Sequence, residues 1–438
     1  MKFRKFLILT GKKFSAAYQA FLTAVGADGG TVEAKAYTDA LLQTAENASI
    51  VQIPSAYKAA VLYNQVPTPT GQDFTVARAS DVIRTNESGV LESLGSNVPC
   101  IDHSDGFPVL LTQPQSTNLV TYSNDFSDAY WLKSGGGTAD APLITPNFGT
   151  SPDGLQNADR VQLELNGGVA SGDISQITGS ITTTLVDNTT SIYIKSNDNN
   201  NYPITIVTVA GNNVTFTADQ EWKRVETTGL ASTTSNSFRL RTRGSEGSSD
   251  STDILVYQAQ IEPLSYATTI IPTSGATATR LGDVISGAGS TASINSEEGV
   301  MHVDCATFVN GGEGLEISLS DGTIDNRASL VPSFTVGRLD FVYRVGGVTV
   351  TQIFSGTGLD KTIINSYDIK WKLNDFELFV NGVSVATNTS GAVAAANTFN
   401  TLEFARGNGS SNPFYGKTKQ LRVYESIADA QIDLPYIT

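Results

Sequence analysis

The chain has 438 residues, of which 40% are hydrophobic and only 16% charged, and its formal net charge is -15. This length predicts about two or three domains. The composition excludes a coiled coil, because charged helix formers are too few, and a typical disordered chain, because apolar residues are plentiful. The acidity argues against binding to nucleic acid phosphates or anionic lipid, and no segment approaches the ~20 apolar residues of a membrane span, so we expect neither nucleic acid partners nor membrane insertion.

Residues 1–53 hold the one clear helical pattern. Phe14, Tyr18 and Phe21 recur at helical spacing, and the glycines at 26–30 interrupt the pattern before a second stretch resumes it. The apolar run at 6–9 is too short for the h-region of a secretory signal. A helical segment this small has too little core of its own, so we expect Phe14, Tyr18 and Phe21 to pack on another chain or on the next segment.

Residues 54–118 predict an extended connector. Prolines are spread through this segment, and proline interrupts both helices and central strands. Short strand-like runs occur at 73–80 and 89–94. The segment has too few apolar residues for a core, so we expect it to pack on neighbouring domains or chains.

The rest of the chain predicts two antiparallel β-sandwich domains, which makes the fold mainly β. Residues 119–272 contain at least six short strand-like runs separated by turn clusters, a spacing typical of a sandwich or jelly roll. Residues 273–295 are small, polar and glycine-rich, which predicts a linker or crossing arm. Residues 296–438 form a second β domain, in which Asn381–Gly382 is the strongest hairpin signal and Gly346–Gly347 a similar one.

Few residues offer catalytic chemistry, and we expect no enzyme activity. The only histidines are His103 and His302, and the sequence has no HExxH, GxSxG or phosphate-loop motif. Glycoside hydrolysis needs two carboxylates, and Glu313, Glu377 and Glu403 could face a concave surface, but we expect solvated outward positions for them instead. Cys100 and Cys305 lie far apart outside any CxxC motif, so we expect buried free thiols.

Two further features suggest ligand sites. The loops at 196–201 and 321–326 are rich in oxygen ligands and could hold a structural Ca²⁺, although neither has EF-hand spacing; we expect no other cofactor. Trp131, beside Tyr130 and before a glycine run, is the tryptophan we expect nearest a surface, and both are candidate ligand-binding residues. Trp222 and Trp371 begin or alternate within strands and are predicted core residues.

Two sequence stretches resemble tailed-bacteriophage virion proteins. The stretches are DFTVARASDVIRTNESGVLESLGSNVPCIDH (73–103) and FPVLLTQPQSTNLVTYSNDFSDAYW (107–131). The positions that match the pattern are Arg78, Ala79, Ser80, Arg84, Asn86, Gly89, Leu110, Leu111, Pro114, Gln115, Thr117, Asn118, Leu119, Tyr122, Ser123, Phe126 and Trp131. Gln113 and Ser116 depart from the Glu and Arg typical of that family. The C-terminal segments 367–385 and 416–432 resemble a concanavalin A-like, or laminin G-like, sandwich.

The resemblance implies a head- or tail-fibre or spike subunit on the virion surface. Its expected parts are a helical anchor containing Phe14, Tyr18 and Phe21, a carbohydrate-binding-module-like jelly roll, and a concanavalin A-like domain. The implied partners are other virion proteins of the capsid, portal or tail, further copies of the chain, with a trimer favoured, and host surface polysaccharide. Two alternatives remain open: a purely structural decoration or assembly protein, and a polysaccharide depolymerase. The resemblance brings no catalytic residues.

Overall fold

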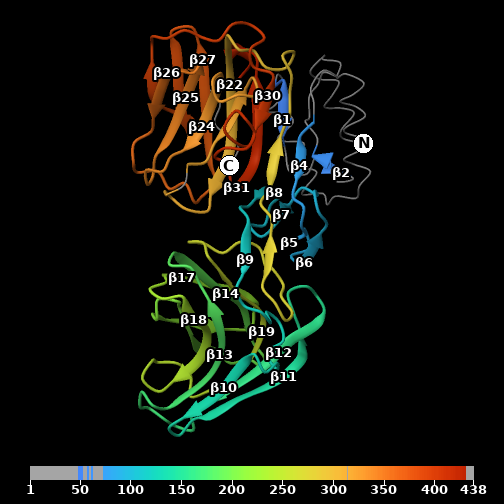
Figure 1. Ribbon diagram of the computed structural model, residues 1–438, viewed down its shortest axis with the longest axis vertical. Coiled ribbons are helices and arrows are strands. Elements are labelled where there is room, and N and C mark those ends of the chain that lie inside the picture. The colour runs from blue at the N-terminus through green and yellow to red at the C-terminus, as the bar shows by residue number, and fades with distance from the viewer. Residues whose placement is uncertain (1–47, 53–56, 59–60, 63–72, 313, 431–438) are drawn as a thin grey trace. The chain divides into compact units, whose positions relative to one another are not determined.

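The computed structural model describes residues 48–52, 57–58, 61–62, 73–312 and 314–430. The chain divides into two compact units, each built from separate stretches of sequence. The terminal unit comprises the described parts of residues 1–78, 97–112 and 283–438, and the central unit comprises 79–96 and 113–282. The described residues are mainly β, and their one helical element is the short 3₁₀ turn η1 (Ile427–Asp429) (Figure 1). No helix within them is both long and apolar enough to cross a membrane.

Two antiparallel sheets build the terminal unit. The larger, here called the β22 sheet, runs in the order β29 (Val383–Asn388), β28 (Asp375–Val380), β27 (Asn365–Lys372), β22 (Glu298–Thr307), β31 (Gly416–Tyr424), β8 (Val109–Thr112) and β7 (Ile101–Asp102), with β1 (Ile50–Gln52) also paired to β31. The smaller, the β24 sheet, runs β26 (Val348–Phe354), β25 (Leu339–Val345), β24 (Arg327–Pro332), β23 (Ile317–Ser320) and β30 (Thr401–Glu403).

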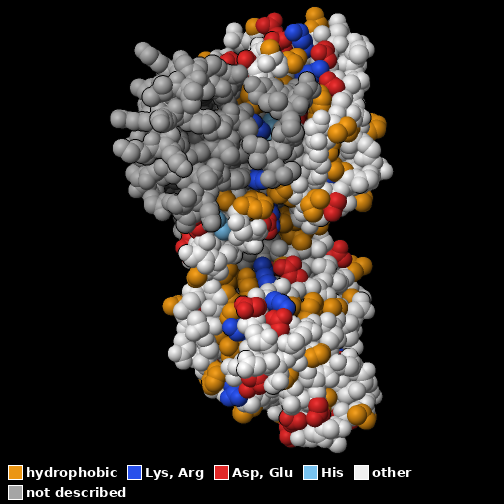
Figure 2. All heavy atoms as spheres, turned by 180° about the vertical axis from the view of Figure 1, so that it is seen from behind, with side chains coloured by type: hydrophobic (Ala, Val, Ile, Leu, Met, Phe, Trp, Pro, Cys, Tyr) orange, Lys and Arg blue, Asp and Glu red, His pale blue; other side chains and the backbone are white. Residues whose placement is uncertain are grey.

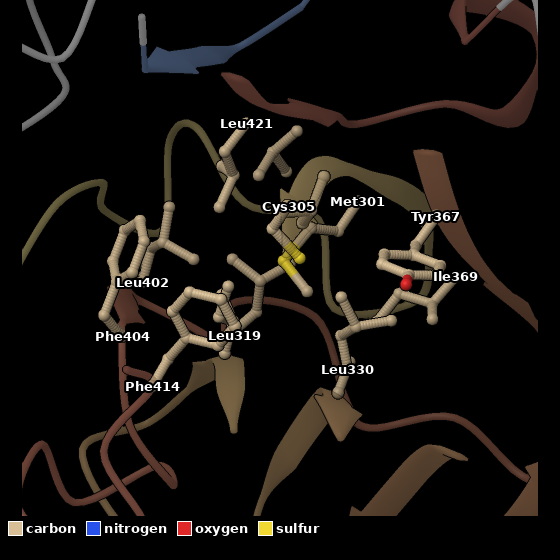
Figure 3. Close-up of a cluster of buried hydrophobic side chains, with 14 of the residues drawn as sticks. Met301, Cys305, Leu319, Leu330, Tyr367, Ile369, Leu402, Phe404, Phe414 and Leu421 are labelled. Carbon is tan, nitrogen blue, oxygen red and sulfur yellow. The ribbon is translucent and has the colours of Figure 1, made fainter. Parts of the chain in front are cut away.

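The two sheets enclose one hydrophobic core. Met301 and Cys305 of the β22 sheet and Leu319 and Leu330 of the β24 sheet point toward one another in Figure 3 and belong to a single buried cluster. Trp371 also lies in this cluster with 0% of its surface exposed, which confirms it as a core residue. Alternate residues along each strand supply this core, as the period of two in a β-strand requires.

The central unit repeats this architecture with two five-stranded antiparallel sheets. The β18 sheet runs β10 (Trp131–Gly136), β13 (Ile174–Thr182), β18 (Ser235–Arg243), β15 (Tyr202–Val207) and β16 (Asn213–Ala218). The β19 sheet runs β11 (Asp140–Thr150), β12 (Gln156–Glu164), β19 (Ser251–Glu262), β14 (Asp187–Ser196) and β17 (Lys223–Leu230). Between β13 and β19 the chain passes repeatedly from one sheet to the other, and residues such as Ile177 and Ile254 from opposite sheets share one core (Figure 1).

The predicted connector and linker contain regular structure instead of independent extended chain. Residues 73–118 and 273–295 contribute to three paired ladders: β4 (Thr75–Ala77) with β21 (Val284–Ser286), β9 (Ser116–Asn118) with β20 (Ala278–Arg280), and the hairpin of β5 (Val82–Thr85) with β6 (Leu91–Leu94). A further short pair joins β2 (Tyr57–Lys58) and β3 (Val61–Leu62). The boundaries at 118, 273 and 295 therefore differ from those of the folded units, because strands distant in sequence form the β4–β21 and β9–β20 ladders.

Several local predictions can be compared directly with the structure. Asn381 and Gly382 have positive φ angles of 50° and 75° between β28 and β29, and Gly346–Gly347 likewise joins β25 to β26, so both hairpins are confirmed. Cys100 and Cys305 are buried and neither is part of a disulfide, as expected. The helical segment predicted within residues 1–53 falls almost entirely outside the described residues.

Candidate functional site

The outer face of the β18 sheet carries a row of arginines. In β18, Phe238 and Leu240 point into the core and are 0% exposed, so the alternating residues Arg239, Arg241 and Arg243 point outward. Adjacent arginines in this row are about 7 Å apart along the strand, from the rise of a β-strand. The row lies on the central strand of the sheet, with two strands on each side.

Neutral hydrogen-bonding side chains flank the arginines. On the β13 side the strand register places the partly exposed Thr178 beside Arg239 and the partly exposed Gln176 beside Arg241. On the β15 side the neighbours are Val207 and Thr205, which are buried. The other polar residues that point outward from these strands are Ser134, Ser180, Thr182, Ser237, Asn213, Thr215 and Thr217. Hydroxyl and amide groups of this kind both donate and accept hydrogen bonds.

The β18 sheet differs from its partner sheet in charge. None of its five strands, all of which are described, contains an aspartate or glutamate. The β19 sheet carries carboxylates on every one of its strands, including Asp159, Glu226 and Asp253. In a chain with a net charge of -15, the β18 sheet is therefore locally basic.

One carboxylate from the following loop reaches this face. Glu246 Oε2 accepts a hydrogen bond from Arg241 Nε at 3.0 Å, and Glu246 Oε1 lies 3.4 Å from Arg243 Nη1. Asn213 joins the cluster by accepting from Arg241 Nη2 at 2.7 Å and donating to Glu246 at 2.8 Å. Arg239 is exposed, its Nε donates to Ser237 Oγ at 2.7 Å, and no carboxylate of the described chain lies within ion-pair distance of it.

The outer face of the β19 sheet is covered, in contrast. Tyr257 and the partly buried Tyr193 and Trp222 pack with Leu91 of the β5–β6 hairpin in a small hydrophobic cluster. Hydrogen bonds hold the covering segments in place, from Leu91 N to Pro152 O at 3.0 Å and from Tyr257 Oη to Asp153 Oδ2 at 2.8 Å. Trp222 is therefore partly buried in this outer cluster and not in the main core, which corrects its predicted place.

Trp131 does not face solvent, so the expectation that it lies nearest a surface among the tryptophans is wrong. The indole is 1% exposed, stacks on Phe126 at 4.9 Å between ring centroids, and donates from Nε1 to Tyr122 O at 2.9 Å. Tyr130 is half-buried and donates to Ser180 O at 3.0 Å, and burial raises the pKa of its hydroxyl to about 12. The prediction took the glycines after Trp131 as a sign of an exposed loop, but Gly135 and Gly136 form the end of β10.

Two of the three candidate carboxylates, Glu377 and Glu403, lie in the described part of the chain, on different sheets. Glu313 and the predicted anchoring residues Phe14, Tyr18 and Phe21 lie outside the described residues. Glu377 pairs with Lys370 at 2.6 Å. Glu403 is 7% exposed, and burial raises the pKa of its carboxyl group, so a solvated outward position does not describe it.

In the two loops predicted as Ca²⁺ sites, the aspartate carboxylates accept hydrogen bonds from residues nearby in the sequence. Asp198 accepts hydrogen bonds from Asn200 N at 2.8 Å and Tyr202 Oη at 2.7 Å, and these bonds lower the pKa of Asp198 to about 2. Asp321 accepts from Thr323 N and from Asn326 Nδ2. Within the described ranges, no group of three or more His, Cys, Asp or Glu residues is placed to hold a metal ion.

His302 is packed between two aspartates. Its Nδ1 lies 2.8 Å from Asp368 Oδ1, its Nε2 lies 3.0 Å from Asp304 Oδ1, and the residue is 1% exposed. Burial lowers the pKa of His302, but the two carboxylates outweigh that effect and raise it above its ordinary value. The sequence did not reveal this cluster, because β22 and β27 bring the residues together from distant segments.

The residues that resemble the phage pattern have structural roles here. Arg84 Nε and Asn86 Nδ2 both donate to Glu92 across the β5–β6 hairpin. Asn118 is 0% exposed and makes four hydrogen bonds to the main chain, donating to Ala259 and Ile271 and accepting from Val120 and Ile261. Gln113, one of the departures from the pattern, accepts from Thr269 Oγ1 at 2.9 Å.

The arginine row was missed by sequence reasoning, although the signal was present. The segment SFRLRTR at 237–243 alternates polar or basic residues with Phe238 and Leu240, which predicts a strand with arginines on its exposed side. The composition of the whole chain indicates only its net negative charge and gives no sign of a basic row. Only the sheet order shows that these arginines lie at the centre of a face without strand carboxylates.

Comparisons with known proteins give distant similarities only. No protein-family model matches the chain, and no curated protein matches it in sequence. The chain is similar to the CBM40 of a Ruminococcus gnavus sialidase bound to α2,3-sialyllactose, at 18% identity and TM-score 0.28, over 34% of this chain and 91% of that one. It is also similar to domain 4 of AbnA, a GH43 extracellular arabinanase from Geobacillus stearothermophilus in complex with arabinotriose, at 14% identity and TM-score 0.28, over 36% and 75%.

A third similarity covers more of the chain. Domains LG4–5 of the mouse laminin α1 chain match at 11% identity and TM-score 0.22, over 67% of this chain and 90% of that one. Scores this low carry no information about what the present chain binds.

Proposed function

We propose that this protein binds cell-surface glycan through the outer face of the β18 sheet. The observation that carries the proposal is the contrast between the two faces of the central unit: the β19 sheet is covered by the β5–β6 hairpin and the 151–155 loop, whereas the β18 sheet presents exposed Arg239 among hydroxyl and amide side chains. Sugars offer many hydroxyl groups, which neutral donors and acceptors on a rigid sheet can satisfy.

We place this activity on a bacteriophage particle, as a fibre or spike subunit. The support for this part is the sequence resemblance of residues 73–131 to virion proteins. On the side shown in Figure 2, the described surface is mostly neutral, with small groups of charged side chains of both signs and small apolar patches. On this proposal the chain acts by binding, has no enzyme activity, and assembles as a trimer, which light scattering on the purified full chain measures directly.

The face can be tested by blocking it sterically. Thr178 lies on β13 beside Arg239 in the strand register, so Thr178→Trp places an indole over the centre of the face. A matched control is Thr387→Trp, on the exposed edge strand β29 of the terminal unit. Both variants must keep the thermal transition of the parent chain to be informative.

The measurement is binding of the full chain to an array of neutral and acidic bacterial polysaccharides. We expect Thr178→Trp to weaken binding about tenfold or more, because the added side chain clashes with a ligand on this face. The control variant should bind as the parent does. Absence of binding to every polysaccharide would instead favour the purely structural virion protein, and release of reducing ends would favour the depolymerase.

A further inference from the structure

The arginine row also indicates which class of glycan fits this face. Arg239, Arg241 and Arg243 point outward from one strand, and the five strands of the sheet supply no carboxylate. Glu246 lies against Arg241 and Arg243 and offsets one of these three positive charges. The cluster therefore keeps a positive excess of two charges, three arginines less one glutamate, within a chain of net charge -15.

Arg239 is the member best placed to meet a ligand. It is exposed, and its one side-chain hydrogen bond within the described chain uses Nε, so both terminal nitrogens can bond to a ligand. Arg241, in contrast, is 5% exposed and engaged by Glu246 and Asn213. A guanidinium is planar, stays charged, and matches a carboxylate with two parallel N–H···O bonds.

This inference rests on the proposed glycan-binding function. We propose that the ligand is an acidic saccharide and that Arg239 binds its carboxylate. The sugar hydroxyls are then bonded by Thr178, Gln176 and the Ser and Thr side chains of the neighbouring strands. Arg243 contributes a second, partly offset positive charge about 14 Å along β18 from Arg239, which suits a polymer with repeated carboxylates. Arg241 and Glu246 position the row and do not need to contact the ligand.

The experiment measures binding of the full chain to three acidic polymers: polygalacturonate, alginate and polysialic acid. Each polymer is paired with its carboxyl-reduced form, which keeps the sugar backbone but carries no charge. We expect at least one acidic polymer to bind. Its carboxyl-reduced form should bind at least about tenfold more weakly, and the affinity of the acidic form should fall as the salt concentration is raised.

Substitutions of Arg239 then distinguish the contribution of its charge to binding from that of its paired hydrogen bonds. We expect Arg239→Gln to weaken binding about tenfold, or ~1.4 kcal/mol, and Arg239→Lys to retain part of the affinity, because an ammonium keeps the charge but loses the paired hydrogen bonds. Arg160→Gln is the matched control: it removes the same charge from the outer side of the β19 sheet, where Arg160 pairs with Asp253. The control should bind as the parent does.

Each contrary outcome identifies what has failed. Equal binding of an acidic polymer and its reduced form, or an Arg239→Gln variant that binds like the parent, would overturn the acidic ligand while leaving the glycan-binding function intact. Binding to neutral polysaccharides alone would do the same. Failure to bind any polysaccharide would overturn the proposed function itself, and stronger binding to single-stranded DNA than to every saccharide would overturn both.

Discussion

Arg78 and Asp283 form a buried ion pair, with 2.8 Å between Nη1 and Oδ1, although 205 residues separate them in the sequence. Arg78 Nη2 also donates to Val98 O at 3.0 Å, and Arg78 N donates to Asn97 Oδ1 at 2.9 Å. These residues stand at the points where the three stretches of the terminal unit end or begin, at 78, 97 and 283. One guanidinium group therefore links all three stretches within the terminal unit.

Removing Arg78 should destabilise the terminal unit strongly. We expect Arg78→Met to lower the free energy of unfolding by about 3–5 kcal/mol, because it leaves the Asp283 carboxylate buried without this partner. Chemical denaturation measures the change, and the Asp283→Ala and double variants complete a double-mutant cycle. Arg84→Met is the control, since Arg84 pairs with the partly exposed Glu92 and should contribute only about 0–1 kcal/mol. Equal effects of the two substitutions would contradict a special role for Arg78.

Trp131 should matter for stability and not for ligand binding. Its indole fills the core of the central unit, so we expect Trp131→Ala to lower the free energy of unfolding by about 3–5 kcal/mol and Trp131→Phe by less. Glycan affinity, measured at a temperature where the variant remains folded, should be unchanged. A variant that keeps the parental melting temperature but loses its ligand would show that Trp131 belongs to the binding site after all.

Lys361 should make stability depend on pH in the alkaline range. The residue is 2% exposed, its Nζ donates to Ser333 O at 2.7 Å, and burial lowers the pKa of the amino group to about 8. Between about pH 8 and the ordinary lysine value of about 10.4, the unfolded chain binds more protons than the folded one, so the free energy of unfolding contributed by this group rises with pH.

The test compares the parent chain with Lys361→Met across that range. The difference in the free energy of unfolding should shift in favour of the parent as the pH rises from 8 to about 10, because only the parent gains stability by releasing this proton. Effects of buried tyrosines are common to both chains and cancel in the difference. A difference that is the same at pH 8 and at pH 10 would contradict this role of Lys361.

Local pattern was enough to predict the strands and several of their turns. Tyr367, Ile369 and Trp371 alternate with polar residues, and all three lie in the core of the terminal unit. Asn381–Gly382 specifies a hairpin because both residues tolerate the positive φ that its turn requires. These features depend on neighbours within a few residues, and the sequence contains those neighbours.

Pairing over long distances could not be predicted in the same way. The predicted domain boundaries followed the order of the sequence, whereas β1 pairs with β31 and β8 extends the same sheet from residues 109–112. The main-chain donors and acceptors of such a segment must be paired when buried, but its own composition does not reveal which strand completes those hydrogen bonds.

The sequence by itself determined a mainly β chain, the period-two pattern of its strands and the arginines of 237–243 on one side of a strand. Only the tertiary structure decided that Arg239 is exposed on a sheet free of strand carboxylates, that Arg241 is buried beside Glu246, and that Trp131 is buried. The reason is physical: backbone conformation and side-chain alternation follow from local sterics, but exposure depends on what else packs against a surface. The partners of Trp131 include Phe126, five residues away, but also Phe238, which is more than a hundred residues away.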